Sequence, residues 1–511
     1  MDAFEEFQQD ARQGQIDLQR LLEEFAGLQS KLLAAEQRIE VLQTENKVLR
    51  TEIGELKKPL GGSAPPAKVD EAFSLRAEEK RQRARGKRQR KESKKRRRGR
   101  IANEEKIRRA EKTEDVYPAD LPAEQCCLSH VRVVWRLQQG RAVLVAYRIF
   151  RGPQKQYGVI PGVLGRSEFG LEIVVTLAYL IHVLGLSFDK TCLVMGFLQN
   201  LQLSKSQADA LLRQLSRHWS GEFDILCTLL ANSLVVHADE TSWSINSVWT
   251  FLSEKTRLLF FGVHKDAATL KEILDPELFA GLLFSDDAAV YANFTTAQKC
   301  WAHLLRKAIK LTLQDAAGKY RAFADGLLEI YYQAKRIQRD GRLSDAGRER
   351  KVDALVTEVF GLCGPVWLEN PPPQGLEHDR RLLALEIMRL ALAKQLFTFV
   401  TAKPAEQPNG ARPPIDATNN EAERTLRNPA QARKTGRTSK TPAGARRTSI
   451  LTSVLESLRL YLPKYTLSNV IEEIQRWQAT GRSCFRALME TLNLPPPDHS
   501  VLDRVLPQPS G

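Results

Sequence analysis

The chain has 511 residues, of which 42% are hydrophobic and 27% charged, and its formal net charge is +15. This length exceeds one ordinary hydrophobic core, so several domains are expected, and the basic excess favours a polyanionic partner. The seven cysteines include no C-x-x-C pair, which argues against a disulfide framework and for a reducing compartment. The most apolar segment, residues 170–188, contains Glu172 and His182 and is predicted to be a buried helix, not a membrane span.

Residues 1–58 are predicted to form a coiled-coil dimerisation helix. Apolar residues recur there in alternating steps of three and four, which is the spacing of a heptad repeat. A lone asparagine at an a position favours a parallel dimer in fixed register. The residues assigned to dimerisation are Leu21, Leu28, Leu42, Asn46, Leu49 and Leu56. The alternative is a long amphipathic helix that packs on its own domain.

A linker and a basic tract are predicted over residues 59–115. The Pro- and Gly-rich stretch Pro59–Lys68 ends the helix, and Lys80–Arg100 then contains 14 Lys or Arg and one acid, Glu92. Such a tract contacts DNA phosphates and provides affinity without sequence choice. The alternatives are a solvated charged linker and a localisation signal. The DNA contacts in this tract are assigned to Lys94, Lys95, Arg96, Arg97 and Arg98.

Residues 116–165 are expected to be a small β-rich segment, because residues 131–137 and 141–150 alternate as half-buried strands do. Cys126, Cys127 and His130 lie just before these strands. Three potential ligands without a second spaced pair do not predict a zinc site, so zinc is not expected as a cofactor.

Residues 166–225 are predicted to be a helical domain. Three helices with short turns are expected at 171–184, 188–198 and 205–218, the last one opened by a capping box at Ser204–Gln207. This arrangement allows a helix-turn-helix-like DNA reader or a plain helical subdomain. The expected DNA contacts on the third helix include Lys205 and Arg213.

The catalytic core is predicted to be assembled from residues 226–303 and 415–462. Its first part shows three strand-like runs, a helix and a fourth strand, which is the order of a ribonuclease H-like core. The expected elements are strands at 234–238, 247–252, 258–263 and 281–284 and a helix at 269–274. An all-α insertion over 304–414 is expected to interrupt this core, and a C-terminal helical tail over 463–511 to follow it. The predicted fold class is thus multidomain α/β.

Acidic residues lie where these elements end or begin. Asp239 comes near the end of the first strand, Asp286 and Asp287 follow the fourth, and Glu421 and Glu423 open a later helix. Strand-end aspartates and a helix glutamate offer the hard oxygen ligands that Mg²⁺ prefers, and two such ions stabilise phosphodiester displacement. The alternatives are a strand cap for the first aspartate, a turn role for the second and a helix ion pair for the glutamate.

Four motifs in chain order resemble the transposases of the insertion-sequence-66 family. They are H-A-D-E-T, L-F-S-D-D-A-A-V-Y, C-W-A-H-L-L-R-K and T-N-N-E-A-E-R-T-L-R. The resemblance covers roughly residues 170–460 and implies a DDE-type transposase with a ribonuclease H-like catalytic core. The cysteine-rich zinc finger of that family is reduced here to Cys126 and Cys127, so residues 116–165 occupy a degenerate zinc-finger position.

The resemblance assigns roles to individual residues. Asp239, Asp286 and Glu423 match the catalytic, metal-binding positions, and the implied cofactor is a pair of Mg²⁺ ions, with Mn²⁺ as an alternative. Asp287 falls where the family has glycine and Glu421 at a variable position, so the choices between Asp286 and Asp287 and between Glu423 and Glu421 stay open. Accessory active-site residues are expected at His303, Trp301 and Asp287.

The segment Arg424–Arg447 adds eight Lys or Arg and no acid, and it is expected to contact the phosphates of the transposon ends. The alternative is a solvated charged face. The DNA-binding residues assigned outside the first basic tract are Lys205, Arg213, Arg424, Arg427, Arg433, Lys434 and Arg437.

The predicted function is a DNA transposase that binds the terminal inverted repeats of an insertion sequence and catalyses metal-dependent DNA cleavage and strand transfer. The expected partners are double-stranded DNA, as element ends and as target, further copies of the chain in a homodimer or higher oligomer, and accessory transposition proteins, with no membrane. The expected location is the bacterial cytoplasm, in association with the nucleoid. Two alternatives stay open: a catalytically inactive transposase-derived DNA-binding protein, and a ribonuclease H-like nuclease without strand transfer.

Overall fold

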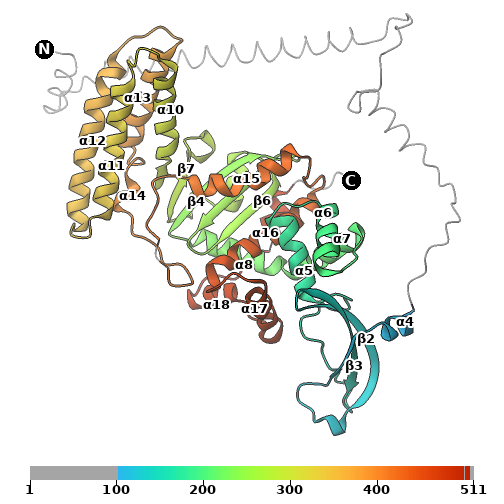
Figure 1. The fold of residues 1–511 in the computed structure, drawn as a ribbon. Coiled ribbons are helices and arrows are strands. Elements are labelled where there is room, and N and C mark those ends of the chain that lie inside the picture. Colours follow the sequence, from blue (N-terminus) through green and yellow to red (C-terminus); the bar gives the residue numbers. More distant parts are fainter. Residues whose placement is uncertain (1–101, 412, 500, 507–511) are drawn as a thin grey trace, which may run out of the picture. The chain divides into compact units, whose positions relative to one another are not determined.

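The computed structural model describes residues 102–411, 413–499 and 501–506 (Figure 1). The predicted coiled coil with its dimerisation residues and the basic residues Lys94–Arg98 lie outside the described residues. Among the helices that are described, none combines the length and the apolar character needed to cross a lipid bilayer.

The first described elements form a three-stranded sheet with the order β1-β3-β2. The strands β2 and β3 form a long antiparallel hairpin whose turn, Gln139–Gly140, has positive φ at both residues, as a two-residue hairpin turn requires. Strand β1 pairs with β3 in parallel. The hairpin agrees with the two strands expected at 131–137 and 141–150. The bounds are α4 (Asn103–Arg108), β1 (Lys112–Val116), η1 (Ala123–Gln125), β2 (Cys127–Gln138) and β3 (Arg141–Arg151).

Four helices connect this hairpin to the central sheet. Ser204 caps α7 with the reciprocal hydrogen bonds of a capping box, as its sequence predicts. The first predicted helix is α-helical only to Ala178 and ends in a π-helical turn, which widens the helix by one residue per turn. The bounds are α5 (Leu171–Ala178), η2 (Tyr179–Val183), α6 (Phe188–Gln199), α7 (Lys205–His218) and α8 (Ser220–Ala231).

The central sheet has five strands in the order β6-β5-β4-β7-β8. Strand β5 pairs antiparallel with both β4 and β6, whereas β7 pairs in parallel with β4, and β8 in parallel with β7. The sheet is therefore mixed, and it agrees with the predicted strands except that the three-residue strand β8 was not foreseen. The bounds are β4 (Val235–Ser242), β5 (Ser247–Ser253), β6 (Arg257–Val263), α9 (Ala267–Ile273), β7 (Leu282–Ser285), η3 (Ala289–Tyr291) and β8 (Ala297–Lys299).

A serine row on α16 covers the outer edge of this sheet. The backbone N–H groups of Arg257, Leu259 and Phe261 in the edge strand β6 donate to the hydroxyls of Ser457, Ser453 and Ser449, each at 2.9 Å. The serines recur every four residues, and alternate residues of the strand present their N–H groups outward, so the two periodicities match over three contacts. An edge that could pair with another chain is thus blocked by a helix of the same chain.

The insertion is a helical bundle with a hydrophobic core of its own. Figure 1 shows α10, α11, α12 and α13 side by side, and they contact one another in sequence order. The bundle core also takes in Val235, Leu282 and Phe284 from strands β4 and β7, so the insertion packs directly on the strands that carry the acidic residues. The bounds are α10 (Trp301–Gln314), α11 (Arg321–Arg339), α12 (Asp345–Leu368), α13 (Leu376–Leu392) and α14 (Thr398–Thr401).

The chain then returns to the sheet through α15, which contacts β4 and β5, and α16, which lies along β6 (Figure 1). Of the last three helices, α17 packs against α5, α18 against α8 and α19 against α9. The bounds are α15 (Asn420–Lys434), α16 (Pro442–Tyr461), α17 (Leu467–Thr480), α18 (Cys484–Thr491) and α19 (Val501–Val505).

Candidate active site

Asp239 and Asp286 lie on neighbouring parallel strands at matching positions. The register pairs Val236 with Leu283 and His237 with Phe284, and two further steps bring Asp239 opposite Asp286. Adjacent strands are about 4.8 Å apart, and residues in register point to the same face of the sheet. The strand β7 ends at Ser285, so Asp286 is the first residue beyond it.

The environment of Asp239 disfavours its charged form. Burial, as the largest cause, and the nearby carboxylate of Glu240 raise the pKa of Asp239 to about 7, and the charges of Asp286 and Glu423 add to the shift. The backbone N–H of Glu240, which donates to Oδ1 of Asp239 at 2.9 Å, opposes it. The carboxylates of Asp286, just after β7, and of Glu423 in α15 are therefore close enough for their charges to act on Asp239 in β4.

Asn419 fixes the start of α15 against this part of the sheet. Its side-chain amide donates to the backbone carbonyl of Ala238 at 2.7 Å, and its backbone N–H donates to Sγ of Cys300 at 3.1 Å. The side chain is 1% exposed. Because Glu423 lies one helical turn after Asn419, these two contacts hold the glutamate beside the strand that carries Asp239.

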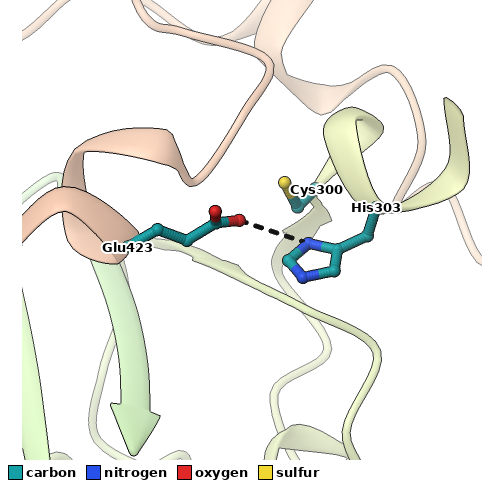
Figure 2. A group of neighbouring side chains, drawn as sticks. All are labelled: Cys300, His303 and Glu423. Carbon is teal, nitrogen blue, oxygen red and sulfur yellow. Dashed lines mark ion pairs between the residues drawn. The ribbon is translucent and has the colours of Figure 1, made fainter. Parts of the chain in front are cut away.

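Glu423 faces the beginning of α10. Its two carboxylate oxygens accept hydrogen bonds from Arg306 at 2.9 and 3.0 Å, and Oε1 lies 3.7 Å from Nδ1 of His303. Figure 2 shows Glu423, Cys300 and His303 pointing toward one another. Among the described residues, these three form the only group of acids, histidines and cysteines whose potential ligand atoms all lie within 4.8 Å of one another. The set Asp239, Asp286 and Glu423 is not gathered that closely.

The family model described as Transposase IS66 family matches residues 166–447. This chain belongs to the IS66 family of transposases. The matched segment runs from the turn before α5 to the beginning of α16 and includes all three acidic positions. Membership implies a DDE-type transposase that acts on DNA, and enzymes of this type usually use divalent metal ions. A search of curated proteins found no match to the chain.

For this family member, the structure distinguishes the surroundings of the two alternative aspartates. Asp287 forms an ion pair with Arg389 of α13. Asp286 accepts a hydrogen bond from the backbone N–H of Ala288 at 3.1 Å, and its charge raises the pKa of Asp239. The chain leaves β7 at Ser285 and bends at Asp287, so the two neighbours have different partners although both line the same cavity.

The two alternative glutamates also point to different partners. Glu421 pairs with Arg257 of β6 at 2.8 Å, and the two line a small pocket with Asp416 and Arg424. Glu423 instead faces His303 and Arg306, and its charge acts on Asp239.

The glutamate of the H-A-D-E-T motif serves to position other residues. The side chain of Glu240 is 2% exposed, pairs with Lys265 at 2.6 Å and accepts a hydrogen bond from the hydroxyl of Tyr291. Burial, chiefly, and the charge of Glu240 raise the pKa of Tyr291, so the phenol stays protonated and able to donate. This bond ties the middle of β4 to the short helix η3 that follows Asp286.

A buried lysine, Lys299, supports Asp286 and was missed by the sequence analysis. Its ammonium group donates to the hydroxyl of Ser285 and to the backbone carbonyl of Asp286, both at 3.1 Å. Burial lowers its pKa. A cavity of about 670 Å³ opens in front of these residues, and its lining includes His303, Lys307 and Arg389. The signal that could have found Lys299 is a charged residue directly before the C-W-A-H motif.

Trp301 lies inside the core of the helical insertion. It is fully buried, its indole N–H donates to the carbonyl of Leu396 at 2.7 Å, and its ring packs near Tyr331 and Phe397. The structure therefore brings His303 and Asp287 to the 670 Å³ cavity but not Trp301, which anchors α10 instead.

Two of the assigned DNA-binding regions meet in space. Arg213 of α7 and Arg447 at the start of α16 both pair with Asp209, although 234 positions separate the two arginines. They line a second cleft of about 670 Å³ together with Arg217. Lys205 pairs with Asp189 at 2.7 Å.

The basic residues of α15 and the turn after it differ in their contacts. Arg433 donates to the carbonyl of Ser242 at 2.9 Å and Arg437 to that of Gly185 at 2.6 Å, so part of their donor capacity is used inside the fold. The exposed members of the set are Arg424, Arg427, Lys434 and Arg437.

Proposed function

We propose that this chain is an active transposase that binds the terminal inverted repeats of its element and catalyses DNA cleavage and strand transfer, with Asp239, Asp286 and Glu423 as the catalytic, metal-binding residues. The observation that carries the proposal is the convergence of three carboxylates within a segment that matches the family. Asp239 of β4 and Asp286, the first residue after β7, fall at matching positions when the β4–β7 register is extended by two residues, and the charges of Asp286 and Glu423 both act on Asp239.

The order of the sheet supports a ribonuclease H-like core. The central strand is β4. On one side of it β5 and β6 follow in antiparallel pairing, and on the other side β7 and β8 follow in parallel pairing. In such a core the first and fourth strands carry the acids, as β4 and β7 do here. The domain division stated for the sequence, with its coiled-coil dimer and its basic tract, is part of the same proposal.

The donor set fits a pair of Mg²⁺ ions. All three side chains offer hard carboxylate oxygens. Burial, chiefly, and the charges of Glu240, Asp286 and Glu423 raise the pKa of Asp239, and a bound cation would stabilise its charged form. When bound, such ions stabilise charge on the attacking and leaving oxygens of a phosphodiester. Arg306 now neutralises Glu423, so it must release that carboxylate when a cation takes it.

The proposed reaction has two displacements. Water attacks the phosphorus atom at the element end, the bond from phosphorus to the 3′ oxygen breaks, and a 3′-hydroxyl is left. That hydroxyl then attacks a phosphodiester of the target, so one phosphorus–oxygen bond forms and one breaks. The protein contributes by orienting the carboxylates: Asn419 holds the start of α15, and Lys299 holds the backbone of Asp286. No covalent protein intermediate is required.

The test is cleavage and joining of supercoiled DNA that carries the element's own ends, with Mg²⁺ and accessory proteins supplied. The parent is expected to give joined products, whereas Asp239→Asn and Glu423→Gln give neither cleavage nor joining. Glu421→Gln serves as the matched control, because this carboxylate lies on the same helix turn but pairs with Arg257. A parent that binds the ends and never cuts them would identify an inactive DNA-binding descendant. A parent that cuts and never joins would identify a nuclease.

A further inference from the structure

The group Cys300, His303 and Glu423 has the composition of a site for a transition metal. The first two residues occupy the N-cap and the first turn of α10, and the third lies in the first turn of α15. Their ligand atoms, one sulfur, one imidazole nitrogen and one carboxylate oxygen, all lie within 4.8 Å of one another (Figure 2). Tetrahedral zinc with these ligands needs separations of about 3.3 to 3.8 Å, so a movement of about 1 Å closes the site.

The hydrogen bonding of the nitrogen and sulfur atoms in this group supports a bound metal ion. Nδ1 of His303 is buried and has no hydrogen-bond partner within the described ranges, and its distance of 3.7 Å from Glu423 is too long for a hydrogen bond. Sγ of Cys300 accepts a hydrogen bond from the backbone N–H of Asn419 at 3.1 Å, which orients a lone pair of the sulfur. Burial raises the pKa of this thiol despite that bond, so the cation itself must displace the thiol proton. The fold therefore holds the sulfur in place and leaves the lone pair of the imidazole nitrogen available to a ligand.

The donor types choose among metals. A thiolate and an imidazole select zinc, cobalt or cadmium over Mg²⁺, which prefers oxygen alone. One thiolate and one carboxylate also neutralise a divalent cation, so a half-buried site carries no net charge. The nearby cation Arg306 is about half exposed on its side chain and can turn toward solvent when Glu423 changes partner.

We propose that Cys300, His303 and Glu423 form a binding site for a zinc-class divalent cation, with a fourth position open to water or to an oxygen of the DNA. This site adjoins the carboxylate pair of Asp239 and Asp286, because Cys300 and His303 line the same cavity as Asp286, and it shares only Glu423 with the proposed catalytic set. It differs from the zinc position that the sequence analysis set aside, since Cys126 and Cys127 bond instead to backbone carbonyls. If the proposed function holds, zinc withdraws Glu423 from catalysis and inhibits the reaction.

The test is titration of the full-length chain, without a polyhistidine tag, with Co²⁺ in the absence of DNA. The parent is expected to bind one equivalent with the visible bands of tetrahedral cobalt and a sulfur-to-cobalt charge-transfer band. Zn²⁺ should abolish both, and millimolar Mg²⁺ should not. Loss of a first-coordination ligand weakens binding beyond the 10- to 100-fold typical of outer ligands, so Cys300→Ser and His303→Gln should each cost more than about 100-fold. Circular dichroism establishes that the variants fold.

The matched control is Cys127→Ser, which removes an exposed thiol close to His130 and leaves α10 intact. Retention of the charge-transfer band in this variant, with its loss in Cys300→Ser, supports the site. Absence of the band in the parent, its loss in Cys127→Ser, or unchanged affinity in His303→Gln overturns the proposal. Because the readout uses neither DNA nor Mg²⁺, a failure here leaves the transposase proposal to its own assay.

Discussion

The outer edge of the central sheet and its acidic end differ in how far their buried polar groups are paired. At the edge, three serine hydroxyls of α16 each accept from a backbone N–H of β6, and all three serines are fully buried. At the acidic end, Asp239 lies near other carboxylates, and burial, chiefly, and their charges raise its pKa to about 7. Paired polar groups stabilise the fold, whereas a buried carboxylate with a strongly raised pKa marks a place where a ligand can bind. Mutations at the edge should therefore affect stability, and mutations at the acidic end should affect chemistry.

The largest effect is expected from Asp286→Asn compared with Asp287→Asn. A metal ligand contributes several kcal/mol to transition-state stabilisation, so the first change should lower cleavage of element ends at least about 1000-fold. The second breaks an exposed ion pair with Arg389 and should cost less than about tenfold. Single-turnover cleavage rates measure both, and thermal unfolding should show little change. Equal losses in the two variants would erase the distinction between these neighbours.

The converse prediction concerns Ser453→Ala. This change leaves the buried N–H of Leu259 without its partner at 2.9 Å, which should lower the free energy of unfolding by about 2 kcal/mol. The adjacent Thr452→Val is the control, because the buried hydroxyl of Thr452 has no hydrogen-bond partner among the described residues, so its loss should cost little. Urea unfolding measures both variants. A Thr452→Val variant as unstable as Ser453→Ala would mean that packing, and not the hydrogen bond, stabilises this edge.

A third prediction extends the comparison to a cavity of about 510 Å³ that is lined by residues of α15, α16 and β6 and by His182 of η2. Burial, mainly, and the charge of Arg447 lower the pKa of His182 to about 3. Between pH 3 and 6.5 the unfolded chain therefore binds a proton that the folded chain does not, so stability falls as pH falls through this range. His182→Leu removes this pH dependence. When the pH falls from 7.5 to 5, the free energy of unfolding of the variant should therefore rise by about 2 kcal/mol relative to that of the parent.

Urea unfolding of parent and variant at the two pH values isolates this histidine, since the other titrating groups are common to both. A difference between the two proteins that does not change with pH would show that the imidazole is solvated or partnered in solution.

The smallest effect is expected from Arg306→Gln. This cation is about half exposed and competes with a divalent ion for the carboxylate of Glu423. An exposed ion pair is worth about 1 kcal/mol or less, so its removal should lower the Mg²⁺ concentration needed for half-maximal cleavage by up to about fivefold. The control is Lys307→Gln. Lys307 lies next to Arg306 on α10, and the change breaks its ion pair with Glu386 of α13. A higher Mg²⁺ requirement in Arg306→Gln would show that this arginine assists catalysis.

The sequence by itself determined the local elements and the family. Period-two and period-four patterns predicted the hairpin and most strands and helices, because hydrophobic periodicity and capping act over a few residues. The acidic motifs and their order predicted the family that is found over residues 166–447, and the three carboxylates that they single out stay a prediction. The strand β8 was not predicted, because three residues are too few to show a hydrophobic periodicity.

Only the tertiary structure decided which distant side chains meet. The contact of Glu423 with His303 and Arg306 joins two helices more than a hundred residues apart, and the start of α15 is held there by the hydrogen bonds of Asn419 with Ala238 and Cys300. The serine row reads in sequence as polar residues on a helix, and its burial against β6 has no local signal. Such contacts depend on how the insertion and α15 return to the sheet, and that is set by the packing of two hydrophobic cores, not by the residues on either side of each motif.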